Sequence, residues 1–284
     1  MQISKITSRN SKFPDSLRHI ELAPKQLYIL GDLGDAPKVA IVGSRAPTAY
    51  GKRVTYDFAY ELARAGVTVV SGLANGIDAE AHRGAIDGGG KTIAVMAGGL
   101  DRIYPPSNRS LALKILETGG AIVSEYPEKT DPLKFRFLER NRIISGLSLG
   151  TVVTEASIKS GSLVTADYAK KQDRIVMAVP GPITSQLSAG PNNLIRDVAT
   201  AIVSTSDILA AVDLASMKLA TKQIAPASAI EAKILEAMNA GNAKGQDLIA
   251  ATGMDAAHFA GVISLMEISG KVRNLGASTW IPRK

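Results

Sequence analysis

Short apolar runs alternate with amphipathic stretches over most of this chain, and that alternation restricts the folds it can adopt. A strand covered on both faces carries consecutive apolar, mostly β-branched residues. The runs of this kind are Val39–Val42, Val67–Val70, Thr92–Met96, Ala121–Val123, Thr151–Thr154, Ile175–Val179 and Ala201–Val203. The helices expected between them are Tyr50–Ala65, Ile77–Asp87, Asn108–Thr118, Phe135–Leu147, Leu163–Gln172 and Asn192–Ala199. Strict alternation predicts an α/β domain at residues 38–210 with a doubly wound, mainly parallel sheet.

The segments outside residues 38–210 have weaker patterns. Residues 1–37 read as an N-terminal lead-in with one candidate strand at Leu27–Leu30, and residues 211–227 read as a linker. Residues 228–284 contain three short amphipathic helices followed by a candidate hairpin around Leu275-Gly276. Three helices and a hairpin in so short a segment predict a small winged-helix domain.

Composition excludes several classes of protein. The chain has no cysteine, so disulfides and thiolate metal sites are excluded, and its three histidines show no metal spacing. No apolar run approaches the ~20 residues of a membrane span, and nothing in the first residues resembles a signal peptide. We therefore expect a cytoplasmic protein that has no metal or cofactor and does not associate with membranes.

The charge of the chain points to the kind of partner. A net charge of +7 and a pI near 9.5 favour a polyanion, either nucleic acid or a phosphorylated ligand. Ordinary basic surface charge that keeps a protein in solution is the alternative interpretation.

Small and polar residues follow almost every expected strand. Examples are Gly43–Arg45 after the first strand, Asn75-Gly76 in the loop after the second, and Ser160–Ser162 at the start of a later helix. Parallel strands bring such loops to one edge of the sheet, where ligands bind in open α/β folds and helix N-termini attract anions. Turn and capping needs explain any single loop. Six such loops together predict a phosphate-directed binding edge.

The densest basic stretch runs from Lys134 to Arg142 and mixes cations with aromatic rings. Single-stranded nucleic acid needs both, because cations neutralise the backbone and flat rings stack with bases. At helical spacing Phe137, Arg140 and Asn141 share one side, whereas Arg142 lies about 200° around from Arg140. Arg140 is therefore the preferred ligand contact.

Several neighbouring residues have a structural interpretation. Arg142 is either a ligand contact or the ion-pair partner of Glu139, three residues before it. Phe135 is expected in the core, and His82 is expected to be a structural histidine. The carboxylates Asp78 and Glu155 fit helix capping and loop support as well as acid–base chemistry. No catalytic residue is assigned.

Six segments stand in an order that resembles one protein family. They are V-A-I-V-G-S-R at 39–45, S-G-L-A-N-G-I-D-A-E-A-H at 71–82, Y-P-P-S-N at 104–108, R-N-R-I-I-S-G-L-S at 140–148, E-A-S-I-K-S-G-S-L-V-T-A at 155–166 and V-P-G at 179–181. The series resembles the DNA-processing protein DprA family, also called Smf, of bacterial natural transformation. The resemblance covers about residues 38–210, and the C-terminal tail resembles that family's winged-helix domain.

The resemblance implies an extended Rossmann-like domain that forms a homodimer and binds single-stranded DNA. It also implies that the protein protects incoming DNA from nucleases and passes it to the RecA recombinase, without catalytic activity. The loops and the resemblance together predict DNA contacts at Gly43, Ser44, Arg45, Asn75, Gly76, Lys134, Phe137, Arg140, Asn141, Ser160, Gly161 and Ser162. Asn75 stands where relatives often carry Lys or Arg, and Leu138 stands where Pro is usual.

Other interpretations remain open at this point. A nucleotide-processing phosphoribohydrolase-like enzyme shares a related fold, but its P-G-G-x-G-T-x-x-E signature is absent. A small-nucleotide sensor with a duplex-reading tail is a second alternative. Against it, the expected recognition helix Asp255–Ser269 has no Lys or Arg, which favours a protein-interaction role for the tail. Apolar positions between Leu187 and Leu209 fit a dimer surface and a core equally well.

Overall fold

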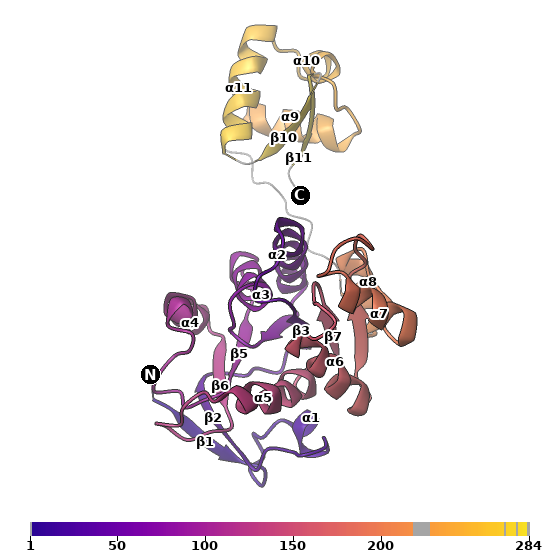
Figure 1. Ribbon diagram of the computed structural model, residues 1–284. Helices are drawn as coiled ribbons and strands as arrows, with labels where there is room; N and C mark the ends of the chain where they lie inside the picture. The colour runs from indigo at the N-terminus through magenta and orange to yellow at the C-terminus, as the bar shows by residue number, and fades with distance from the viewer. Residues whose placement is uncertain (1, 218–227, 270, 277, 283–284) are drawn as a thin grey trace. The chain divides into compact units, whose positions relative to one another are not determined.

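A computed structural model describes residues 2–217, 228–269, 271–276 and 278–282 of the chain (Figure 1). The chain divides into two compact units, Met1–Ala220 and Thr221–Lys284. The first unit holds a mixed sheet with helices on both faces, and the second holds three helices and a hairpin.

Nine strands of the described residues form one sheet in the order β1-β2-β6-β5-β4-β3-β7-β8-β9. The strands are β1 Ser4–Thr7, β2 Gln26–Gly31, β3 Lys38–Val42, β4 Thr68–Ser71, β5 Thr92–Met96, β6 Ala121–Ser124, β7 Gly150–Val153, β8 Ile175–Ala178 and β9 Thr200–Ala201. All pairs from β6 across to β9 are parallel, which confirms the predicted α/β class with its mainly parallel sheet. From β3 the chain adds β4, β5 and β6 on one side, and then crosses to the other side of β3 to form β7, β8 and β9. The switch in direction between β3 and β7 leaves a crevice beyond their carboxyl ends, where ligands bind in such sheets.

Helices cover both faces of the sheet (Figure 1). They are α1 Asp15–Arg18, α2 Ala49–Arg64, α3 Ile77–Asp87, α4 Arg109–Glu117, α5 Lys134–Gly146, α6 Gly161–Lys171, α7 Ala189–Asp197, α8 Thr205–Ala211 and the short 3-10 helix η1 Pro106–Asn108.

A hydrophobic core lies on each face of the sheet, and successive residues of β3 point into opposite cores. Val39 and Ile41 pack with α2 and α3, whereas Ala40 and Val42 pack with α5 and α6. A central strand buried on both sides therefore reads as an unbroken apolar run.

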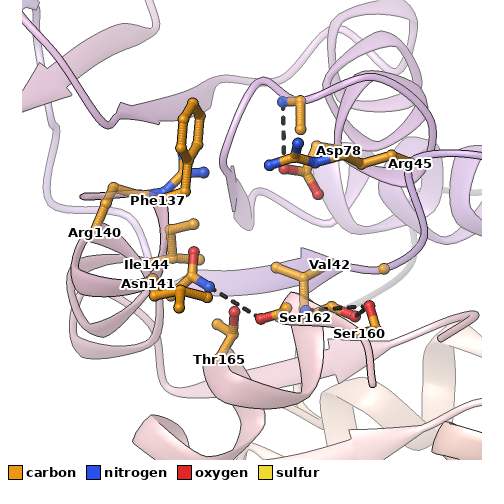
Figure 2. Close-up of a pocket in the computed structure, with 14 residues that line it drawn as sticks. Val42, Arg45, Asp78, Phe137, Arg140, Asn141, Ile144, Ser160, Ser162 and Thr165 are labelled. Atoms are coloured by element: carbon orange, nitrogen blue, oxygen red, sulfur yellow. Dashed lines mark hydrogen bonds between the residues drawn. The ribbon is translucent and has the colours of Figure 1, made fainter. Parts of the chain in front are cut away.

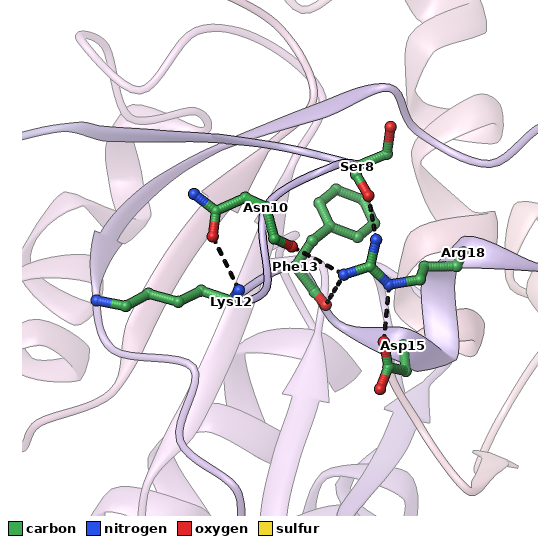
Figure 3. Close-up of polar contacts among 6 residues, drawn as sticks. All are labelled: Ser8, Asn10, Lys12, Phe13, Asp15 and Arg18. Carbon is green, nitrogen blue, oxygen red and sulfur yellow. Dashed lines mark hydrogen bonds and ion pairs between the residues drawn. The ribbon is translucent and has the colours of Figure 1, made fainter.

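The lead-in expected at residues 1–37 contributes two strands, β1 and β2, to the sheet. The candidate strand at Leu27–Leu30 is confirmed as part of β2, which pairs antiparallel with β6 and with β1. Between these strands, Arg18 donates hydrogen bonds to the carbonyls of Ser8, Asn10 and Phe13 (Figure 3). Its Nε also lies 2.7 Å from Oδ1 of Asp15. Arg18 thus holds a mostly exposed turn of chain, of which only Phe13 is buried, and a hydrophobic pattern does not reveal such contacts.

The second unit has its own core. Its elements are α9 Ala229–Asn239, α10 Gly245–Thr252, α11 Ala256–Ile268, β10 Val272–Gly276 and β11 Thr279–Pro282. The buried side chains Ile234, Leu248, Phe259 and Met266 pack together among the three helices. The expected hairpin is confirmed, but β10 continues through Leu275 and Gly276, where the turn was expected. Residues 218–227, most of the expected linker, lie outside the described residues.

No single helix among the described segments is long and apolar enough to cross a membrane. Helices α10 and α11 reach the length and apolar composition of a membrane span only when taken together, and the chain bends by 110° between them.

Candidate functional site

A pocket of about 170 Å³ opens in the crevice beyond β3. Figure 2 shows Phe137, Arg140 and Asn141 on α5 facing Arg45 across it, with the start of α6 along another side. Eight of the twelve residues predicted to contact DNA line this one pocket: Gly43, Arg45, Phe137, Arg140, Asn141, Ser160, Gly161 and Ser162. Segments far apart in sequence therefore meet here because parallel strands deliver their loops to one edge.

The other four predicted residues lie outside this pocket. Asn75 and Gly76 line an adjoining cavity, which also includes Arg45. Ser44 lines neither cavity, and its backbone N–H donates to the Glu155 carbonyl at 2.7 Å. Lys134 is the exposed first residue of α5 and lines neither cavity.

An aromatic ring and two guanidinium groups gather at the pocket. The Arg45 guanidinium carbon lies 5.2 Å from the centre of the Phe137 ring, and that of Arg140 lies 6.0 Å from it. The exposed ring of Tyr104 lies 5.7 Å from the Phe137 ring, centre to centre, at an interplanar angle of 56°. Tyr104 had no predicted role, although it begins the Y-P-P-S-N segment. The group combines flat faces with positive charge, as stacking of nucleic-acid bases requires.

Arg45 and Arg140 differ in exposure and in partners. Arg45 is exposed at the pocket rim, whereas Arg140 is only 4% exposed. Nη1 of Arg140 donates to the Gly72 carbonyl at 2.7 Å and also to the Val95 carbonyl. Burial lowers the pKa of Arg140 to about 10, although the nearby Asp78 carboxylate opposes that shift. Arg140 therefore ties the ends of β4 and β5 to α5, and Arg45 is the cation more open to a ligand.

The start of α6 forms another side of the pocket. Ser160 is its N-cap, and the Ser160 hydroxyl accepts from the Ser162 N–H at 3.3 Å. Asn141 of α5 donates from Nδ2 to the Gly161 carbonyl at 3.1 Å, which fixes this helix start against α5. Hydroxyls and free N–H groups at a helix N-terminus favour an anion. An anionic group in the pocket would thus meet Arg45 on one side and α6 on another.

The acidic residues near the pocket hold loops. Asp78 is buried and accepts from the N–H groups of Gly72 at 3.2 Å and Ala74 at 3.4 Å. Burial raises the pKa of Asp78, and the charge of Arg140 opposes this. Glu155 accepts from Thr48, at 2.8 Å from its backbone N–H and at 2.6 Å from its hydroxyl. The contacts of Asp78 and Glu155 are those of residues that support loops, rather than of residues that carry out acid–base chemistry.

Two expectations about α5 are wrong. Arg142 does not pair with Glu139: its Nη2 lies 2.8 and 2.7 Å from the two Glu125 oxygens, while Glu139 accepts from the Tyr126 hydroxyl. Glu125 directly follows β6, so the carboxylate that Arg142 contacts comes from the loop after that strand and not from α5 itself. Phe135 is 53% exposed rather than in the core, because only the part of α5 from Arg140 onward is buried.

The family of the chain follows from comparison with known proteins. Residues 4–213 match the DNA recombination-mediator protein A family, a match that includes β1 and β2. The chain belongs to this family. Among curated DNA recombination-mediator relatives, protein Smf of Escherichia coli is 45% identical over 199 residues, which is 69% of this chain and 53% of the relative. The DNA processing protein DprA of Bacillus subtilis is 44% identical over 209 residues, covering 72% of this chain and 70% of the relative.

Solved structures of the recombination-mediator family share this fold. DprA of Streptococcus pneumoniae superposes with a TM-score of 0.68 at 39% identity, covering 74% of each chain. DNA processing protein A of Helicobacter pylori superposes with a TM-score of 0.66 at 33% identity, covering 74% of this chain and 94% of that one. The chain spans about half the length of the Escherichia coli relative.

Proposed function

We propose that this protein binds single-stranded DNA in the pocket beyond β3 and acts as a recombination mediator in natural transformation. The observation that carries the proposal is the exposed Arg45 guanidinium beside the Phe137 ring, facing the N-terminus of α6. The Helicobacter pylori relative binds single-stranded DNA, and this chain shares its fold. In this proposal the protein protects incoming DNA in the cytoplasm and hands it to RecA.

In the proposed complex, phosphates and bases contact different parts of the pocket. A phosphate lies between Arg45 and the first N–H groups of α6, where charge and helix dipole both favour an anion. Bases stack beside Phe137 and Tyr104, and each stacked base contributes about 1–3 kcal/mol. Stacking accepts every base, so sequence preference is weak. Neutralised phosphates make the affinity fall as salt rises.

Contacts of the acidic residues support binding over catalysis. Asp78 and Glu155 hold loops, and Glu125 pairs with Arg142, so none of these three is poised for proton transfer to a ligand. Release of free adenine from AMP would instead favour a phosphoribohydrolase-like enzyme.

A homodimer formed through the first unit completes the proposal. One small pocket holds few nucleotides, and linking two pockets raises affinity through effective concentration. Among the apolar residues considered for such a surface, Ile202 and Ile208 are buried, whereas Val198 and Val203 are 44% and 77% exposed. The exposed pair lies beside the edge strand β9 and is the proposed dimer surface.

The second unit is proposed to be a winged-helix domain at residues 228–284 that binds protein rather than duplex DNA. Its three helices and hairpin have the element order of that fold. The helix α11, which would enter a DNA groove, has no Lys or Arg, whereas a duplex-reading helix is normally basic.

The proposal is tested by comparing oligo-dT with a duplex of equal length across a salt series, with molecular mass measured in parallel. We expect tighter binding of the single strand, a log–log salt slope near −0.7 for each phosphate contact, and the mass of a dimer. A clear preference for duplex would contradict the proposal.

A further inference from the structure

A second cavity of about 270 Å³ adjoins the pocket, and Arg45 lines both. It lies between the loop that follows β3 and the first turns of α2 and α3. Its lining residues are Arg45, Ala46, Pro47, Lys52, Asn75, Gly76, Ala79, Glu80, Arg83 and Asn108. The lining therefore includes three cations and one carboxylate.

The cations of this cavity are in different electrostatic situations. Nη1 of Arg83 lies 2.6 Å from a Glu80 oxygen, so these two charges largely cancel. Lys52 is exposed in the first turn of α2 and has no ion-pair partner among the described residues. Arg45 carries its charge into both cavities. Lys52 and Arg45 therefore give the second cavity an uncompensated positive charge.

The polar groups of the cavity are held in place. Asn75 accepts from the Ser107 hydroxyl at 3.0 Å through Oδ1, which leaves its amide nitrogen as a donor. Asn108 is buried and donates to the Leu73 carbonyl at 2.8 Å, which fixes the loop that carries Asn75. No aromatic residue is in the lining, whereas the first pocket has Phe137 with Tyr104 beside it. The second cavity therefore suits a phosphate rather than a base.

We propose that this second cavity binds the neighbouring phosphate of the same DNA strand, with Lys52 as its main cation and Arg45 between two consecutive phosphate sites. The inference rests on the proposed single-stranded DNA binding. A guanidinium presents five N–H donors in a planar fork, so one arginine can serve two adjacent anions. The strand then passes over the loop of Gly76 with its bases toward Tyr104 and Phe137 and its phosphates toward α2.

The test is fluorescence polarisation with labelled oligo-dT across a salt series for the wild type and three variants of the full chain. Lys52→Ala is expected to weaken binding about fivefold and to reduce the magnitude of the log–log salt slope by about 0.7, the value for one lost phosphate contact. Lys52→Glu is expected to weaken binding further. The matched control is Lys114→Ala, which removes an exposed lysine of α4 that lines neither cavity and is expected to leave both quantities unchanged.

The outcomes separate this inference from the proposed function. If the wild type binds oligo-dT and Lys52→Ala gives the same affinity and slope as Lys114→Ala, the second site is wrong and the first pocket stands. If the wild type does not bind oligo-dT, both proposals are wrong. Free dTMP or inorganic phosphate can be added as a competitor, at the concentration of nucleotides in the oligo-dT. If either displaces the labelled oligo-dT, the cavity binds free phosphate compounds, and the proposed path of one strand through both cavities is wrong.

Discussion

The Arg45 guanidinium lies 5.2 Å from the centre of the Phe137 ring, although the two residues are on different elements of the α/β unit. Arg45 follows β3, and Phe137 is in the first half of α5. Their contact joins the loop that follows the central strand to the helix that covers the opposite side of the crevice. This pairing gives the pocket a positive charge next to a flat apolar face, which is the basis of the proposed DNA binding.

Arg142 is expected to matter for stability rather than for DNA binding. Its guanidinium contacts both oxygens of Glu125, and its side chain is 8% exposed. Arg142→Met leaves the Glu125 charge without its partner, so we expect the free energy of unfolding to fall by about 3 kcal/mol. Urea denaturation measures this. Lys170→Ala, which breaks an exposed pair with Asp197, is the control and is expected to cost less than about 1 kcal/mol. An equal effect of the two variants would contradict the prediction.

His82 is expected to make the folded state sensitive to acid. It is fully buried, and its Nδ1 lies 2.7 Å from the Thr92 hydroxyl, which itself donates to the Val69 carbonyl. Burial, aided by the charges of Arg140 and Arg83, lowers the pKa of His82 to about 3. The unfolded chain, with a histidine pKa near 6.5, therefore binds a proton that the folded chain rejects. The part of the free energy of unfolding that depends on neutral His82 is complete above pH 6.5, and it declines as the pH falls from there toward 3.

The variant His82→Asn separates this effect from that of the carboxylates. An asparagine amide can still donate to Thr92 but does not titrate. Urea denaturation measures the free energy of unfolding of each protein. As the pH falls from 7 to 5, the wild-type value should drop by about 2 kcal/mol more than that of the variant. A difference that stays constant with pH would show that His82 does not cause the acid sensitivity.

Gly76 is expected to be required for the position of Arg45. Its φ is +81°, and a Cβ added there would lie 2.7 Å from the backbone carbonyl atoms of Arg45. Gly76→Ala should lower the free energy of unfolding by about 2–4 kcal/mol and weaken DNA binding, because backbone strain and overpacking add. Gly89→Ala is the matched control, since its φ is +77° with nothing within 4 Å of an added Cβ, and it should cost about 1 kcal/mol. Equal destabilisation by both would show that close packing against Arg45 is unimportant.

The parallel part of the sheet could be predicted from sequence because its strands are buried on both faces. The expected strand Thr92–Met96 and the expected helix Ile77–Asp87 coincide with β5 and α3. In contrast, β1 is an antiparallel edge strand, and β2 pairs antiparallel with a neighbour on each side. β1 is mostly exposed and has no apolar run, whereas the run Leu27–Leu30 predicted a strand at β2 but not its antiparallel pairing in the sheet.

The position of the candidate site was also predictable, because parallel strands bring their following loops to one edge. Gly43, Ser160 and Phe137 meet at one pocket for that reason. Individual contacts were not predictable. Helical spacing suggested a local partner for Arg142, but the closest carboxylate is Glu125, which comes from another element. Likewise, no local pattern places Tyr104 beside Phe137, because that contact depends on how the loop of Tyr104 packs against α5.

The most direct test of the proposed pocket is the affinity of the Arg45→Ala variant for labelled oligo-dT, measured by fluorescence polarisation against the wild type. Arg45 is exposed, so the variant should retain its fold, and an unchanged thermal unfolding midpoint checks this. Losing the cation that lines both cavities is expected to weaken binding more than tenfold, or by more than about 1.4 kcal/mol. An unchanged affinity would contradict the account.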